Sequence, residues 1–184
     1  MENKVAIVSG ANGNLGRAVV QYFLAQKWLV IGMEHRLCSS IIEENYQEIE
    51  VNLLDENATY NCVNKIITDY GRIDALVHTV GGFAMGNIAD TSTQDIFKQY
   101  QLNFETTYNL VRPILDKMQN QKNGDLFFIG SLAGKDTSKG KALFVAKLCN
   151  WLKKPRLAAP ENKSKNDWLK LLRLVAVVDS LVGS

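Results

Sequence analysis

The stretch KVAIVSGANGNLG, residues 4–16, decides the fold. Its first six residues read as a short buried strand, and residues 15–27 carry apolar side chains at helical spacing. Gly10, Gly13 and Gly16 lie in the turn between them, where glycine lets the backbone bend sharply, approach a phosphate and pack the helix on the strand. The N-terminus of a helix also offers free N–H groups and a positive dipole. The stretch therefore predicts a dinucleotide site, with an ordinary tight turn as the alternative.

Strands and helices alternate along the rest of the chain. Helices are predicted over about 56–70 and 93–119, and the further strands are predicted near residues 28–33, 48–52, 73–80 and 125–130. Strands that read as apolar runs and are separated by helices indicate a parallel sheet covered on both faces. The chain has 184 residues, enough for one sizeable core. We expect a single domain over 1–184, with an α/β, three-layer, doubly wound sheet of the Rossmann type.

Charge and cysteine content argue against several other classes of protein. Residues 1–134 contain 10 Lys and Arg against 15 Asp and Glu, whereas residues 135–184 contain 11 against 4. The basic residues of the tail are spread among leucines without a known motif, so nucleic-acid binding is not expected. Neither a membrane span nor a secretory leader is expected, which predicts a cytoplasmic location. The three cysteines fit reduced thiols, and His35 with Cys38 lacks the second pair of ligands that a metal site needs.

Glu34 stands at the end of the second predicted strand, 18 residues beyond Gly16. A carboxylate at this place can accept both ribose hydroxyls of NAD and repels the extra phosphate of NADP. Arg36 follows two residues later and would have the opposite effect. NAD is therefore the expected cofactor, with NADP possible, and a solvated glutamate at a strand end is the alternative.

Four stretches resemble the motifs of a known family. Residues 9–16 look like a Thr-Gly-x-x-x-Gly-x-Gly turn in which Asn14 replaces the middle glycine, and residues 76–82 stand where an Asn-Asn-Ala-Gly strand end belongs. Residues 102–118 and 129–131 are similar to the helix and the strand that carry a catalytic asparagine and serine. The order and spacing resemble the short-chain dehydrogenase/reductase family. Within it, the glycine-rich segments look most like the dihydropteridine reductase branch.

This resemblance implies hydride transfer between a nicotinamide and a carbonyl or imine substrate. It implies that Asn103, Ser131 and Lys147 are the catalytic residues and that the lysine also holds the nicotinamide ribose. The implied cofactor residues are Gly10, Asn12, Gly13, Asn14, Leu15, Gly16, Glu34, Asn52, Leu53, Val80, Gly81, Gly82 and Lys147. For Lys147, a lysine on the solvated face of an amphipathic helix is the alternative reading.

The tail departs from the family after about residue 134. Leu143 precedes Lys147 by four residues, where the resemblance implies a tyrosine that exchanges the proton, and leucine has no proton to exchange. Pro155 should end the helix that carries the lysine. Residues 172–182 are similar to a sixth strand and its exit turn, and we expect the family's last strand and substrate-covering segment to be missing. The tail is therefore expected to be truncated, divergent or partly read in another frame.

Two functions from different classes remain. The first is an NAD-dependent oxidoreductase with weak turnover, and the second is a dinucleotide-binding sensor or scaffold subunit without turnover. A serine hydrolase built on Ser131 is disfavoured, because residues 129–133 lack the Gly-x-Ser-x-Gly elbow. Since the family pairs two long helices across its dimer and Pro155 interrupts the second, a weak homodimer or a monomer is expected.

Overall fold

The structure is a computed structural model that describes residues 3–37, 41–82 and 88–130. Strands and helices alternate in the order β1 (Val5–Ser9), α1 (Asn14–Ala25), β2 (Leu29–Glu34), β3 (Tyr46–Glu50), α2 (Glu56–Tyr70), β4 (Ala75–His78), η1 (Ile88–Asp90), α3 (Thr93–Tyr100), η2 (Gln101–Glu105), α4 (Thr106–Gln121) and β5 (Asp125–Phe128). The predicted sixth strand lies outside the described residues.

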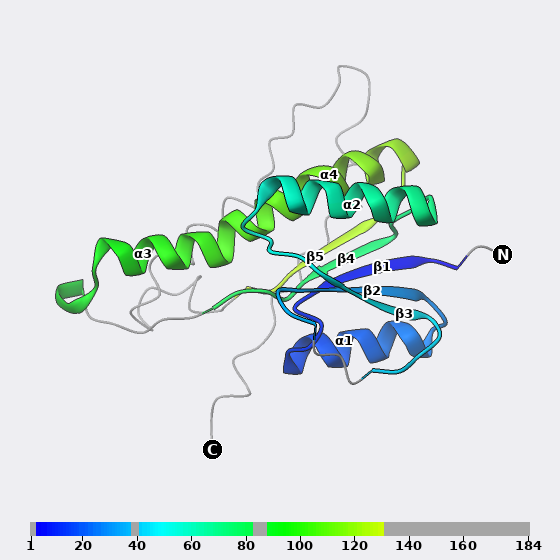
Figure 1. Cartoon of the computed structure of the whole chain (residues 1–184), viewed down its shortest axis with the longest axis horizontal. Helices are drawn as coiled ribbons and strands as arrows, with labels where there is room; N and C mark the ends of the chain where they lie inside the picture. Colours follow the sequence, from blue (N-terminus) through cyan, green and yellow to red (C-terminus); the bar gives the residue numbers. More distant parts are fainter. Residues whose placement is uncertain (1–2, 38–40, 83–87, 131–184) are drawn as a thin grey trace.

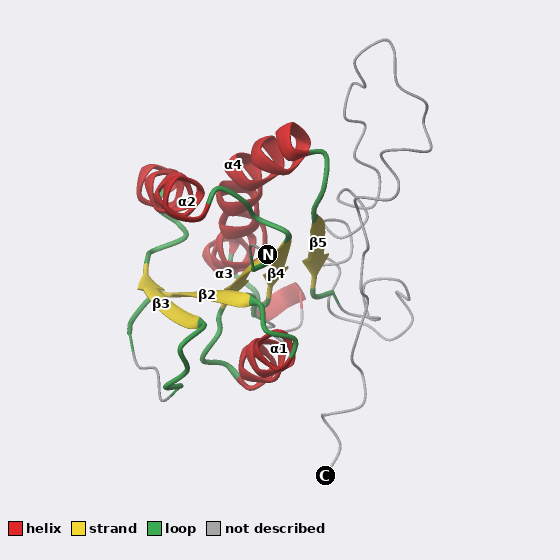
Figure 2. Cartoon of the chain, turned by 90° about the vertical axis from the view of Figure 1, so that its right-hand side faces the viewer, coloured by secondary structure: helices red, strands yellow, loops and turns green. Residues whose placement is uncertain are grey.

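The described strands form one parallel sheet in the order β3-β2-β1-β4-β5. The chain starts in the middle with β1, moves outward through β2 and β3, and then crosses to β4 and β5 on the other side. α1 covers one face of the sheet, while α2 and α4 lie side by side on the other (Figures 1 and 2). The predicted three-layer, doubly wound α/β fold is confirmed. Sheets of this kind bind ligands outside the carboxyl ends of the strands, where the strand order reverses.

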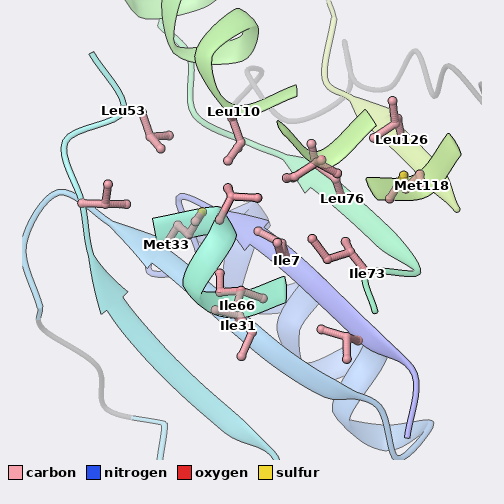
Figure 3. Close-up of a cluster of buried hydrophobic side chains, with 14 of the residues drawn as sticks. Ile7, Ile31, Met33, Leu53, Ile66, Ile73, Leu76, Leu110, Met118 and Leu126 are labelled. Carbon is pink, nitrogen blue, oxygen red and sulfur yellow. The ribbon is translucent and has the colours of Figure 1, made fainter. Parts of the chain in front are cut away.

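Apolar side chains fix the layers on both faces. On the side of α2 and α4, Ile7, Ile31 and Leu76 of the strands meet Ile66 and Leu110 of the helices in one buried cluster (Figure 3). The side of α1 buries a smaller set, namely Ala6, Val8, Ala11, Val20, Phe23, Val30, Ala75 and Val77. Complete burial of one aliphatic side chain contributes about 1.5–3 kcal/mol. The strands are therefore held between two apolar layers, and their carboxyl ends are left to form a site.

α2 confirms the predicted boundaries of its segment. Asp55 Oδ1 accepts a hydrogen bond from the Ala58 N–H at 2.9 Å and caps the first turn. Gly71, with φ +71°, ends the helix in the left-handed conformation. The strand expected near 48–52 runs instead over Tyr46–Glu50. It lies at one edge of the described sheet and is only partly buried, so its apolar pattern marks the ends less clearly.

The helical segment expected over 93–119 is helical but irregular. The π-helical turn η2 separates α3 from α4, and α3 extends beyond the carboxyl ends of the strands (Figure 1). The Thr106 hydroxyl donates to the Leu102 carbonyl at 2.8 Å, and the Thr107 hydroxyl donates to the Asn103 carbonyl at 2.9 Å. Hydroxyl groups that bond to carbonyls one turn back are a local cause of such helix distortions.

Candidate functional site

The glycine-rich turn between β1 and α1 folds as predicted. Gly10 has φ +68°, a left-handed conformation that glycine adopts readily, and its N–H donates to the Met33 carbonyl at 2.9 Å. A Cβ atom at Gly16 would lie 2.0 Å from the Gly10 oxygen and 2.8 Å from Ala11 Cα. Only glycine therefore lets α1 pack this closely on the end of β1.

The first turn of α1 is open beyond β1. Gly13 precedes the helix as its N-cap residue, and no side chain in the described part of the chain caps this end. Gly13, Asn14 and Leu15 are exposed. The N–H groups and the positive end of the helix dipole thus meet solvent, and this arrangement suits an anionic phosphate.

Asn12 joins two carboxylates beside this turn. Its backbone N–H donates to Glu34 Oε1 at 2.5 Å, and its Nδ2 donates to Glu48 Oε1. Glu34 ends β2, while Glu48 belongs to the edge strand β3. Asn12 Oδ1 is buried and has no hydrogen-bond partner among the described residues. A buried acceptor of this kind is costly unless a donor reaches it, so the group suits a ligand with hydroxyl groups.

The carboxyl group of Glu34 is electrostatically unfavourable in this place. Burial raises the pKa of Glu34, the hydrogen bond from the Asn12 N–H lowers it, and the negative charge of Glu48 raises it again. The ionised form lacks enough donors around it. Ribose hydroxyls would supply such donors, whereas a phosphate would add a negative charge.

His78 lies at the end of β4 below the glycine-rich turn. It is buried, with Nδ1 at 2.7 Å from Ser9 Oγ and Nε2 at 3.5 Å from Thr106 Oγ1. Burial lowers the pKa of His78 to about 4, so the ring is neutral at physiological pH. Thr79 Oγ1 donates to the Ser9 carbonyl at 2.7 Å. These contacts hold the ends of β1 and β4 together under the site.

Asn103 lies on the π-helical turn and holds the segment after β4. Its Oδ1 accepts from the Gly82 N–H at 2.9 Å, while its Nδ2 donates to the Gly82 carbonyl at 3.0 Å and to the Gln99 carbonyl at 2.9 Å. Both polar atoms of the side chain are thus bonded to backbone. In this geometry Asn103 positions the loop that follows the strand.

The predicted cofactor residues after β3 differ in accessibility. Asn52 is exposed, and its Oδ1 accepts from the Leu54 N–H at 3.1 Å. Leu53 packs in the core, and its carbonyl accepts from Asn109 Nδ2 at 3.0 Å. The side chain of Leu53 therefore packs in the core under the site and is not open to a ligand.

The remaining predicted residues divide between two parts of the chain. Val80 and Gly82 are partly buried and Gly81 is exposed, all at the carboxyl end of β4 near the glycine-rich turn. Ser131 and Lys147 lie outside the described residues, as do Leu143 and the tail. The structure brings Glu34 to Asn12 of the turn and Val80 to Gly10, and it adds Asn103, which bonds to Gly82.

Glu48, His78 and Thr79 belong to this site but were not among the predicted site residues. Glu48 could have been found only from the register of β3 on β2, in which Gly32 pairs with Glu48 and Glu34 with Glu50. The signal for His78 was a histidine within an otherwise apolar strand. Such a residue is usually held in the core, as it is here.

The described residues offer little to other kinds of site. No group of three or more His, Cys, Asp or Glu among them is placed to hold a metal ion. Cys38, one half of the weak metal pair considered above, lies outside them, and burial raises the pKa of the Cys62 thiol. Within the same ranges, no helix has both the length and the apolar character that a bilayer span requires.

A model of the family described as short chain dehydrogenase matches residues 4–147. The chain belongs to the short-chain dehydrogenase family. The match runs from β1 through all described elements and continues past β5 to the predicted lysine.

Relatives of this short-chain dehydrogenase share about a quarter of its residues. The 3-oxoacyl-[acyl-carrier-protein] reductase FabG of Haemophilus influenzae is 24% identical over 151 residues, covering 79% of this chain and 62% of FabG. A structure of ElxO with bound NADP superimposes with a TM-score of 0.74 at 23% identity, covering 82% of this chain and 64% of ElxO. A short-chain dehydrogenase of Leptospira borgpetersenii with bound NAD+ gives 0.72 at 15%, covering 83% and 64%. The chain thus spans less than two thirds of the length of these proteins.

Proposed function

We propose that this short-chain dehydrogenase binds a nicotinamide dinucleotide and transfers hydride between it and a carbonyl or imine substrate. The observation that carries the proposal is the glycine-rich turn, where Gly16 lets α1 pack on β1 and its uncapped N-terminus faces solvent at the reversal of strand order. FabG is named as a reductase, and the two similar structures hold NADP and NAD+. These names support the same cofactor class here.

The described residues fit a dinucleotide. The open first turn of α1 would hold the pyrophosphate. Glu34 and the unpartnered Asn12 Oδ1 would accept hydrogen bonds from the adenosine ribose. Bound there, the dinucleotide supplies or accepts the hydride. The chain's own part is to bind it, orient it and move a proton.

NAD is the preferred form in this proposal. Glu34 is already poorly solvated and lies beside a second carboxylate, so a phosphate on the ribose would be unfavourable by roughly 1–3 kcal/mol. Arg36 is exposed two residues further on, and its positive charge would favour NADP.

Catalysis would depend on residues of two parts of the chain. Asn103 holds the loop after β4, Ser131 would polarise the substrate oxygen, and Lys147 would hold the nicotinamide ribose. Leu143 stands where the family pattern has its proton donor. General acid–base catalysis typically contributes about 10²–10⁴-fold, so turnover should be weak. A non-catalytic dinucleotide-binding protein is the second candidate, and Leu143 is the residue that favours it.

Turnover with substitutions at one position tests this proposal. NADH oxidation is measured over a panel of carbonyl and imine substrates for the unchanged chain, Leu143→Tyr and Leu143→Phe. Only the tyrosine variant adds a hydroxyl, so it should be faster than the phenylalanine variant by about 10²-fold or more. If both variants bind NADH and neither gains turnover, the non-catalytic function replaces the enzymatic one. Ordinary reductase rates in the unchanged chain would show that Leu143 is not at the donor position.

A weak homodimer or a monomer is the proposed assembly, and the long helical segment carries the surface that would associate. Phe97, Tyr100, Phe104 and Tyr108 form a row of rings along α3, η2 and α4, with centroids 5.1–6.1 Å apart. Phe97 and Tyr108 are 55% and 45% exposed. An exposed aromatic row favours association, and light scattering over a dilution series measures its strength. A tetramer that persists on dilution would contradict this assembly.

A further inference from the structure

Glu48 lies at the ribose end of the proposed dinucleotide site. It is partly buried on the edge strand β3, and its Oε1 accepts a hydrogen bond from Asn12 Nδ2. The backbone N–H of the same Asn12 donates to Glu34 Oε1 at 2.5 Å. One residue of the glycine-rich turn therefore holds two carboxylates that come from neighbouring strands.

Arg17, Arg36 and Glu50 belong to the same region as this pair. Arg17 Nε donates to the Asn12 carbonyl at 3.0 Å, Arg36 follows Glu34 by two residues, and Glu50 is the register partner of Glu34. All three are exposed, so solvent and salt screen their charges. Glu34 and Glu48 are partly buried, and the charge of Glu48 already raises the pKa of Glu34. An anion beside Glu34 therefore meets two negative charges that are screened less than those of the exposed groups, although salt still reaches them.

We propose that Glu48 acts with Glu34 to make the adenosine-ribose subsite select NAD over NADP. The inference rests on the proposed function and names a second determinant of its cofactor preference. Glu34 accepts the ribose hydroxyls. Glu48 positions Asn12 and adds a negative charge that a 2′-phosphate would face. Neutralising Glu34 alone should therefore relax the preference only in part.

Dissociation constants of NADH and NADPH for the full chain test this inference, measured by cofactor fluorescence and calorimetry. Glu48→Gln keeps an acceptor for Asn12 but removes the charge, so NADPH should bind about 3–10-fold more tightly while NADH changes by less than about twofold. The double variant Glu34→Gln/Glu48→Gln should favour NADPH more than either single variant. Glu50→Gln removes the same charge from an exposed position of the same strand and should leave the ratio unchanged.

A salt titration of the unchanged chain gives a readout that needs no substitution. Added salt should lower the ratio of NADH to NADPH affinity, because it screens the repulsion of the 2′-phosphate. A merely structural role for Glu48 would change both affinities equally in Glu48→Gln. That result would overturn the inference, and the proposed function would still stand if the unchanged chain binds NADH. If the ratio of NADH to NADPH affinity shifts in Arg36→Gln but not in Glu48→Gln, the cofactor preference is set by Arg36. If the unchanged chain binds neither cofactor, the proposed function fails together with the inference.

Discussion

The two ends of the parallel sheet differ in whether their polar groups are hydrogen-bonded within the chain. At the amino ends of the strands, the buried Asp74 accepts from Arg72 Nε at 2.8 Å and Nη2 at 2.6 Å, and also from the Val5 N–H at 2.9 Å. The Gln121 side chain bonds both the N–H and the carbonyl of Ile73. This end is therefore satisfied within the chain.

At the carboxyl ends, polar groups are left for a ligand. The N-terminus of α1 has no side-chain cap and Asn12 Oδ1 has no partner, within the part of the chain that the structure describes. Glu34 has a raised pKa because it is partly buried beside another carboxylate. In a parallel α/β sheet the helices start at this end, so the free N–H groups of the helix N-termini lie here. The free carbonyl groups of the helix C-termini lie at the opposite end. One end therefore stabilises the fold while the other can bind.

The largest expected effect on stability comes from breaking the satisfied end. Asp74→Ala should lower the free energy of unfolding by about 3–4 kcal/mol, because the Val5 N–H loses its acceptor and the bidentate ion pair with Arg72 is removed. Denaturant titration measures this loss. Asp74→Asn, which keeps an acceptor, should lose less. NADH affinity of the folded variants should stay the same, and a large change would mean that the two ends are not independent.

A pH titration sharpens the comparison at His78. Its pKa is lowered to about 4 in the folded chain from 6.5, so the unfolded chain binds the proton first. The contribution of the neutral His78 ring to the free energy of unfolding is fully present above about pH 6.5. This free energy should fall by about 3 kcal/mol as the pH drops toward 4. Denaturant curves across this range check the slope. His78→Asn should remove most of it, and an unchanged slope would assign the acid loss to carboxylates.

Gly16→Ala tests the open end directly. The new Cβ would meet the Gly10 carbonyl, which is backbone and cannot rotate away, so α1 must shift. The free energy of unfolding should fall by about 1–3 kcal/mol, and NADH affinity should fall more than stability alone explains. Gly71→Ala is the matched control, because it strains a left-handed glycine far from the turn. Equal loss of NADH affinity in both variants would contradict a specific role for the turn.

The smallest expected effect is at Asn103. Asn103→Ala removes the hydrogen bonds to Gly82 and should cost about 1–2 kcal/mol of stability. The loop after β4 should exchange its amide hydrogens faster, as hydrogen exchange can measure. Gln99→Ala, which leaves the bonds to Gly82 in place, serves as the control. Unchanged exchange at Gly82 would show that Asn103 does not hold this loop.

Much of the fold could be predicted from local patterns. The apolar runs and the glycines gave the strand, turn and helix of residues 4–25, and Gly71 marked the end of α2. The interruption of the long helical segment at η2 was not predicted. Threonine hydroxyls bond back to the carbonyls of this turn, and such bonds leave the spacing of apolar residues unchanged.

The sequence by itself determined the strand-turn-helix that opens the chain, the alternation that requires a parallel sheet, and the carboxylate of Glu34 at a strand end, because each depends on near neighbours. Only the tertiary structure decided that Glu48 joins Glu34 through Asn12 and that Asn103 bonds to Gly82. These contacts link residues 36 and 21 positions apart in the chain. They depend on strand register and on where the η2 turn lies beside the end of β4, which local sequence patterns do not specify.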